Sequence, residues 1–161
     1  MQCAALFIGH CGFAHSAAFF FAEFHCGIGG ILFSVAPALA SATPTKLRVV
    51  YHLADLDKVN FVLGNMQNHL RGAGGPDKIT LAVVVHGPAL SAFKRVDENI
   101  AVSDPMAALL QSGVSFHACG NTLKGMNMTV ADLLGGFAEA PEGGVVRLAA
   151  LQADGWIYLR P

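Results

Sequence analysis

The sequence predicts an α/β protein, a single compact domain built as three layers, α/β/α, around a mostly parallel sheet and preceded by an apolar N-terminal leader. Along residues 43–161, short apolar runs alternate with amphipathic segments, and strands that alternate with helices form parallel sheets covered on both faces. The chain is 53% hydrophobic and 13% charged, which is more apolar than one globular domain needs. The excess lies mostly in residues 1–42, so we expect a leader followed by one domain.

The leader has the composition of a secretory signal. Residues 1–45 hold one charged residue, Glu23, and the apolar run from Gly27 ends in the small-x-small cleavage pattern Ala40–Ala42. A signal normally opens with Lys or Arg, and this one has neither, so a misassigned start and an uncleaved anchor are the alternatives. We expect a periplasmic or exported chain without stable membrane insertion after cleavage, with a cytoplasmic chain as the alternative.

Charge and cysteine usage narrow the function classes. All ten basic residues and ten of the eleven acidic ones lie from Lys46 onward, so the domain is near neutral and predicts no nucleic-acid partner. Cys3, Cys11 and Cys26 lie in the leader, and with the histidines there they match no paired zinc spacing. Cleavage would leave Cys119 as a lone thiol that is buried, intermolecular or reactive. We predict no cofactor and no metal.

The first half of the domain predicts strand, helix and strand. Lys46–Leu53 is the first strand, and Asp55 is a plausible N-cap for the helix that follows. That helix ends at Arg71-Gly72, and Lys78–His86 is a β-branched run typical of a central strand. Its apolar stripe recurs at spacings of three and four: Leu56, Val59, Leu63, Met66 and Leu70.

The segment from Gly87 to Cys119 predicts a short helical piece, a loop, a helix and a strand. Gly87-Pro88 opens a short helical piece, Ala89–Phe93, and the charged segment Lys94–Ser103 is most simply a solvated loop. Asp104-Pro105 predicts a helix start, with Pro at the first position and the end at Gly113. The strand Val114–Ala118 then runs into Cys119.

Helices and one strand complete the chain after Cys119. Gly120, Asn121 and Thr122 are residues that turn a chain and open a helix, and Thr129 caps the short helix Val130–Leu134. The last elements are a helix between Glu142 and Asp154, which places Val145, Leu148 and Leu151 on one face, and a final strand, Trp156–Leu159.

Three consecutive predicted strands end in His52, His86 and Cys119. In parallel sheets ligands bind beyond the carboxyl ends of the strands, so two imidazoles and a thiol can converge there. A histidine can serve as base or cationic partner to a thiolate, and His86 is the better candidate because Gly87 leaves room for a ligand. For each histidine the alternative is a hydrogen-bonded group at a strand end.

The domain resembles the DsrE/DsrF-like family, whose fold is also called YchN-like. The matching segments are VVYHLAD at 49–55, VVVHGPAL at 83–90, FHACGNTLKGM at 116–126 and LQADGWIYLRP at 151–161. The resemblance implies homo- or hetero-oligomers and, in the sulfur-relay members, a persulfide on a cysteine after a central strand, where Cys119 stands. Those relay subunits are cytoplasmic, and Leu123–Gly125 does not reproduce their basic sequence after the cysteine.

Three hypotheses follow. In the first, Cys119 is the acceptor of a sulfur-handling protein, His86 helps to ionise it, and His52, Gly87, Gly120, Asn121 and Thr122 bind the substrate. Its partners would be a second copy of the chain and a sulfur donor or acceptor protein.

In the second hypothesis, the domain is a non-catalytic assembly module with Cys119 in the core and with Phe61, Phe93 and Trp156 exposed before association. The third, a metal site of His52, His86 and Cys119, is the least supported, because nothing fixes their distances.

Overall fold

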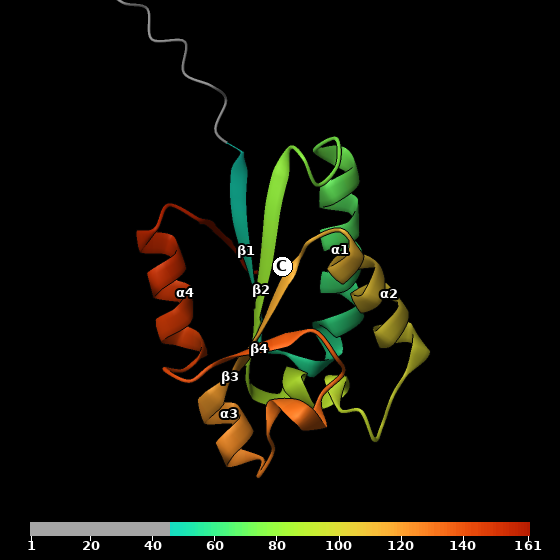
Figure 1. The fold of residues 1–161 in the computed structure, drawn as a ribbon, viewed down its shortest axis with the longest axis vertical. Helices are drawn as coiled ribbons and strands as arrows, with labels where there is room; N and C mark the ends of the chain where they lie inside the picture. Colours follow the sequence, from blue (N-terminus) through green and yellow to red (C-terminus); the bar gives the residue numbers. More distant parts are fainter. Residues whose placement is uncertain (1–45) are drawn as a thin grey trace, which may run out of the picture. The chain divides into compact units, whose positions relative to one another are not determined.

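The computed structural model describes residues 46–161, so the expected leader, residues 1–42, lies outside the described part. Five parallel strands form one sheet in the order β4-β3-β2-β1-β5 (Figure 1). This arrangement confirms the predicted α/β class. The strands are β1 (Leu47–Leu53), β2 (Ile79–Val85), β3 (Ser115–Cys119), β4 (Phe137–Ala140) and β5 (Ile157–Leu159).

Helices lie on both faces of the sheet. Figure 1 shows α1 and α2 side by side on one face and α4 on the other, with α3 beyond the end of β3. Within residues 46–161, no helix combines the length and apolarity needed to cross a membrane. The helices are α1 (Val59–Gly72), α2 (Ile100–Gln111), α3 (Gly120–Gly125) and α4 (Gly144–Ala153), and the 3-10 segments are η1 (Leu56–Lys58), η2 (Gly87–Phe93) and η3 (Val130–Asp132).

The face covered by α1 and α2 holds the main core. Alternate residues of β1 and β2, such as Val49 and Leu81, point into it because successive side chains of a strand face opposite ways. From α1, Leu63 and Met66 are fully buried against them, and Phe93 of η2 packs edge-on against Phe137. The apolar stripe expected for α1 is therefore confirmed except for Leu56, which lies in η1 and is half exposed.

The opposite face has a much thinner core. Among residues 46–161, five buried residues form its apolar cluster, and Trp156 packs against them. Further along β1 and β2 this face ends in the polar residues His52 and His86, at the carboxyl edge of the sheet. The cluster consists of Val50, Ala82, Val84, Leu148 and Leu151.

The start of α2 differs from the prediction. The helix begins at Ile100, where the side chain of Asn99 accepts a hydrogen bond of 2.9 Å from the N–H of Ala101. Pro105 therefore lies inside the helix, where its missing N–H leaves the carbonyl of Ala101 without its intrahelical donor. Burial of apolar side chains on α2 against the core outweighs that loss, so the segment expected to be loop up to Ser103 is helical from Ile100.

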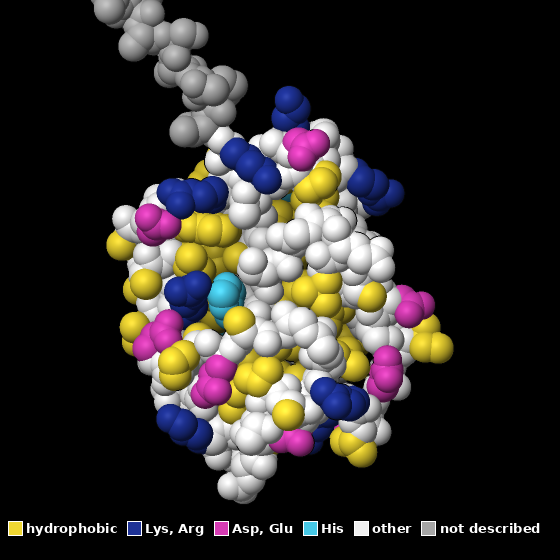
Figure 2. All heavy atoms as spheres, in the orientation of Figure 1, with side chains coloured by type: hydrophobic (Ala, Val, Ile, Leu, Met, Phe, Trp, Pro, Cys, Tyr) yellow, Lys and Arg dark blue, Asp and Glu magenta, His cyan; other side chains and the backbone are white. Residues whose placement is uncertain are grey.

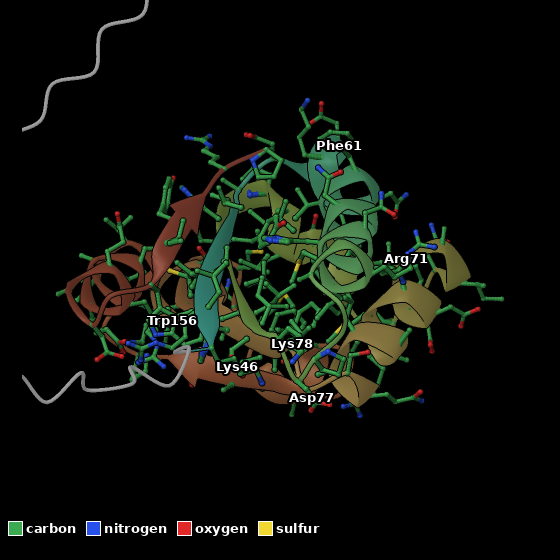
Figure 3. The ribbon with its side chains drawn as sticks, turned by 90° about the horizontal axis from the view of Figure 1, so that it is seen from above. Lys46, Phe61, Arg71, Asp77, Lys78 and Trp156 are labelled. Carbon is green, nitrogen blue, oxygen red and sulfur yellow. The ribbon has the colours of Figure 1, made fainter. Side chains whose placement is uncertain are left out.

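Three further expectations about apolar residues need correction. Val145 is 68% exposed, because α4 turns Gly144, rather than Val145, toward the sheet with Leu148. Phe93 is fully buried, and Trp156 is half-buried beside α4 and β1, so of the three aromatic side chains expected to be exposed only Phe61 is (Figure 3). The sequence patterns also missed β4, an edge strand of four residues.

Candidate functional site

Cys119 is the last residue of β3 and caps the N-terminus of α3. Its side chain points to the thin side of the sheet, where only 6% of the residue is exposed. The backbone N–H of Gly144, the first residue of α4, donates a hydrogen bond to Sγ over 3.1 Å. The thiol thus lies between two helix starts, a position where unpaired N–H groups favour a negative charge.

The surroundings of Cys119 favour its ionised form. Burial alone raises the pKa of the thiol, but hydrogen bonds from the Thr122 hydroxyl and from the N–H groups of Gly144, Thr122 and Asn121 lower it by more. The pKa of Cys119 is therefore below the ordinary value for a cysteine. Because the thiolate is the nucleophilic form, these donors increase the reactive fraction at neutral pH.

Thr122 and Gly87 connect the cysteine to the next strand. The N–H of Gly87 donates to Oγ1 of Thr122 over 3.0 Å, which leaves the hydroxyl hydrogen free for Sγ of Cys119. Gly87 thus contributes its backbone N–H to the site, from a backbone with φ of +59° that favours glycine. Asn121 contributes its N–H, and its side-chain amide lies against Gly143, the N-cap of α4.

The two predicted histidines lie together. The rings of His52 and His86 stack with centroids 4.7 Å apart, and their Nε2 atoms are hydrogen-bond partners. Nδ1 of His52 makes a 2.6 Å hydrogen bond with the hydroxyl of Tyr158 on β5. Adjacent strands β5, β1 and β2 therefore contribute one continuous line of polar side chains at their carboxyl ends.

Both imidazoles are neutral at neutral pH. Burial, followed by the charges of His86 and Arg160, lowers the pKa of His52 to about 4, against a smaller opposing effect of Asp55. Burial and then Arg160 also lower the pKa of His86. Arg160 and Asp55 form a long, exposed ion pair of 3.4 Å beside the pair of rings. The histidines are therefore suited to accept or donate a hydrogen, and not to provide a positive charge.

Gly144 separates the cysteine from the histidines. A β-carbon on Gly144 would lie 3.2 Å from Cβ of Cys119 and 3.3 Å from Cβ of His86, so both residues border one small space. Within residues 46–161, His86 makes no hydrogen bond to Cys119, and no group of three or more His, Cys, Asp or Glu side chains is placed to hold a metal ion. Gly120 has a packing role, because a β-carbon there would meet the carbonyl of Ala140 at 3.0 Å.

Sequence patterns missed several residues of this site. Gly143-Gly144 has no nucleotide-binding motif around it, yet it starts α4 against the thiol. Tyr158 and Arg160 stand in the final segment, where one aromatic and one basic residue are ordinary for an edge strand. The glycine pair before a helix was the one available signal, since glycine permits close approach of the backbone.

Several solved structures are similar to the described fold. MTH1491 from Methanobacterium thermoautotrophicum, a protein of unknown function, is 30% identical, covers 71% of this chain and 99% of its own, and has a TM-score of 0.63. BT1422 from Bacteroides thetaiotaomicron, a conserved protein of unknown function, is 15% identical, with 71% and 94% covered and a TM-score of 0.54. The ychN protein from E. coli is 16% identical, with 72% and 98% covered and a TM-score of 0.50. No curated protein sequence matches this chain.

Fold and site together define a class: a three-layer α/β domain with a hydrogen-bonded cysteine at the carboxyl end of a central strand. The chain belongs to the DsrE/DsrF-like family, whose sequence profile matches residues 31–161. Membership confirms the resemblance noted in the sequence and places the chain in a family of the sulfur-relay kind.

Proposed function

We propose that Cys119 accepts sulfane sulfur from a small donor, carries it as a persulfide and passes it to a partner thiol. The observation that carries this proposal is the set of donors around Sγ, led by the 3.1 Å hydrogen bond from Gly144. These donors stabilise the anionic Sγ of the Cys119 thiolate, the form that attacks the sulfur donor and that leaves again when the sulfur is delivered. With 6% of the residue exposed, small inorganic donors such as polysulfide or thiosulfate suit the site better than bulky ones.

Loading and delivery need no external oxidant. The Cys119 thiolate attacks the sulfane sulfur of the donor and forms an S–S bond, while the donor bond breaks and its electron pair leaves with sulfite or a shorter polysulfide. An acceptor thiolate then attacks the outer sulfur, and Cys119 leaves again as the thiolate. Thr122 and Gly144 are placed to stabilise Cys119 as nucleophile in the first step and as leaving group in the second.

Mass spectrometry after exposure to polysulfide tests the proposal. In the wild type the peptide that contains Cys119 is expected to gain the mass of one sulfur atom in a form that dithiothreitol removes, and the same peptide of Cys119→Ser is expected to gain none, whatever happens at Cys3, Cys11 and Cys26. Equal labelling of the variant, or no labelling of the wild type, contradicts the proposal. Folding of both proteins is compared by circular dichroism, since Ser has nearly the size of Cys.

A second candidate is an assembly module in which Cys119 is packing alone. The low exposure of Cys119 favours it, and so do exposed apolar side chains such as Phe61, Val96 and Ile100. Figure 2 shows apolar surface among interspersed charges of both signs. Alkylation by iodoacetamide separates the two candidates, because a packing residue stays unmodified in the folded protein, whereas a thiolate with a lowered pKa reacts at neutral pH.

A further inference from the structure

A line of hydrogen bonds leads from the surface to the border of the cysteine site. Tyr158 is 37% exposed, and its hydroxyl bonds Nδ1 of His52, whose Nε2 in turn bonds Nε2 of His86. A neutral imidazole carries one N–H and one lone pair on opposite sides of its ring. Two such rings in line pass a proton from one end to the other when each changes its tautomer.

The order of donors shows where the proton would emerge. When Tyr158 donates to Nδ1 of His52, the hydrogen of His52 lies on Nε2 and is donated to Nε2 of His86. The hydrogen of His86 is then on Nδ1, which has no hydrogen-bond partner among residues 46–161. A proton that enters at the hydroxyl therefore leaves at Nδ1 of His86, at the inner end of the line.

The inner end of the line lies next to the sulfur site. The β-carbons of His86 and Cys119 both border the space that Gly144 leaves by having no side chain. A second sulfur atom on Cys119 extends the side chain by about 2 Å, the length of an S–S bond. The outer sulfur of a persulfide is thus the part of the site that can reach toward His86.

The charged groups around the line keep it neutral. Arg160 on the segment after β5 and Asp55 after β1 face the two rings, while Tyr158, Thr122 and Cys119 are the remaining polar or titratable neighbours. The lowered pKa values of His52 and His86 mean that neither ring is cationic at neutral pH. Neutrality is the condition for tautomer exchange, since a doubly protonated ring has no lone pair to accept the next proton.

We propose that Tyr158, His52 and His86 form a proton relay that protonates the outer sulfur of a Cys119 persulfide before that sulfur is delivered. The inference rests on the proposed function and adds one step to it, the protonation of the persulfide anion between loading and delivery. Attack by the thiolate produces Cys119–S–S⁻, an anion that repels an incoming acceptor thiolate. Transfer of one proton from Nδ1 of His86 gives Cys119–S–SH, and a proton from solvent replaces the one that Tyr158 passed to His52. Both rings then hold the opposite tautomer, and a proton that enters at Nδ1 of His86 and returns along the line to Tyr158 resets them. The acceptor thiolate then forms R–S–SH, and Cys119 leaves as the thiolate.

Separate measurements of loading and delivery test the relay. Full-length wild type, His86→Gln and Tyr158→Phe are loaded with polysulfide, and mass spectrometry follows the gain of one sulfur on the peptide that contains Cys119, because the full chain also holds Cys3, Cys11 and Cys26. Delivery to glutathione is then timed after rapid mixing between pH 6 and 9. Loading is expected to be equal in all three proteins. Delivery at pH 8 is expected to fall roughly 100-fold in His86→Gln, the scale of general acid catalysis, and by a smaller factor in Tyr158→Phe.

The pH profile distinguishes a relay from a structural role. Without the relay the proton comes from water, so the rate ratio of wild type to His86→Gln is expected to grow as the pH rises. His69→Gln is the matched control, because His69 bonds a tyrosine hydroxyl in the same way on the other side of the sheet. Equal delivery by His86→Gln and His69→Gln, or a ratio that is constant with pH, overturns the relay while the proposed function stands. Failure of the wild type to load overturns both.

Discussion

Each face of the sheet holds one hydrogen-bonded tyrosine–histidine pair, and the two pairs have opposite surroundings. On the face of α1 and α2, the hydroxyl of Tyr51 bonds Nδ1 of His69 over 2.8 Å, and Tyr51 is only 3% exposed. On the face of α4, Tyr158 bonds Nδ1 of His52 over 2.6 Å, and Tyr158 is 37% exposed. The contacts are alike in chemistry. The first pair is part of a packed core, while the second continues to another histidine and the edge of a cysteine site.

The difference follows from how much helix covers each face. Two helices and η2 bury one face of the sheet, and there burial raises the pKa of Tyr51. Within residues 46–161 a single helix, α4, covers the other face, and the N–H of its first residue, Gly144, is donated to Cys119. The face covered by α1 and α2, the thick face, therefore supplies most of the stability. The face covered by α4, the thin face, leaves polar groups accessible at the carboxyl edge of the sheet, where parallel sheets bind their ligands.

The largest expected effect is a difference in stability between the two faces. Leu63→Ala removes a fully buried side chain from the thick core and is expected to lower the free energy of unfolding by about 4 kcal/mol. Leu148→Ala removes the same atoms from the thin face, where neighbours can collapse into the space, and is expected to cost about 2 kcal/mol. Urea denaturation followed by circular dichroism measures both values. Equal losses would show that the two cores contribute alike.

A smaller effect tests the close approach at the site. Gly144→Ala places a β-carbon 3.2 Å from Cβ of Cys119 and 3.4 Å from Cγ1 of Val84, so it is expected to cost about 1–3 kcal/mol and to displace the N–H from the thiol. Gly64→Ala in α1 is the control, because nothing lies within 4 Å of its added carbon. This control is expected to gain up to about 1 kcal/mol from helix propensity. Slower alkylation of Cys119 in Gly144→Ala alone confirms the local cause, and two stabilised variants would contradict it.

Much of this fold could be predicted from local sequence patterns. The periodicity of the segment around Leu63 and the β-branched run before His86 specify α1 and β2, because burial on one or both faces determines those patterns. The start of α2 could not be predicted in this way, since Pro105 suggests a first turn and only tertiary packing shows that the helix begins earlier. The edge strand β4 was missed because its four residues carry too short a pattern.

The candidate site was predictable in part, for a reason of geometry. Parallel strands end at one edge, so His52, His86 and Cys119 were expected close together, and the strand order places β1, β2 and β3 side by side. Which groups bond which could not be predicted, because that depends on where α4 begins. The donor to the thiol, Gly144, is distant in sequence and has no side chain to mark it.

The smallest expected effect is a pH dependence of stability that belongs to one tyrosine–histidine pair. The pKa of His52 is about 4 in the folded chain against about 6.5 for an exposed histidine, so the unfolded chain binds more protons between these values. Stability is therefore full above about pH 6.5 and is lost as the pH falls toward 4. His52→Gln is expected to flatten this part of the pH profile of the melting temperature, and His69→Gln to leave it as in the wild type. The loss is moderate, because solvent screens a ring that is only partly buried. If His69→Gln flattens the profile as much as His52→Gln does, the two pairs do not differ in the way their surroundings imply.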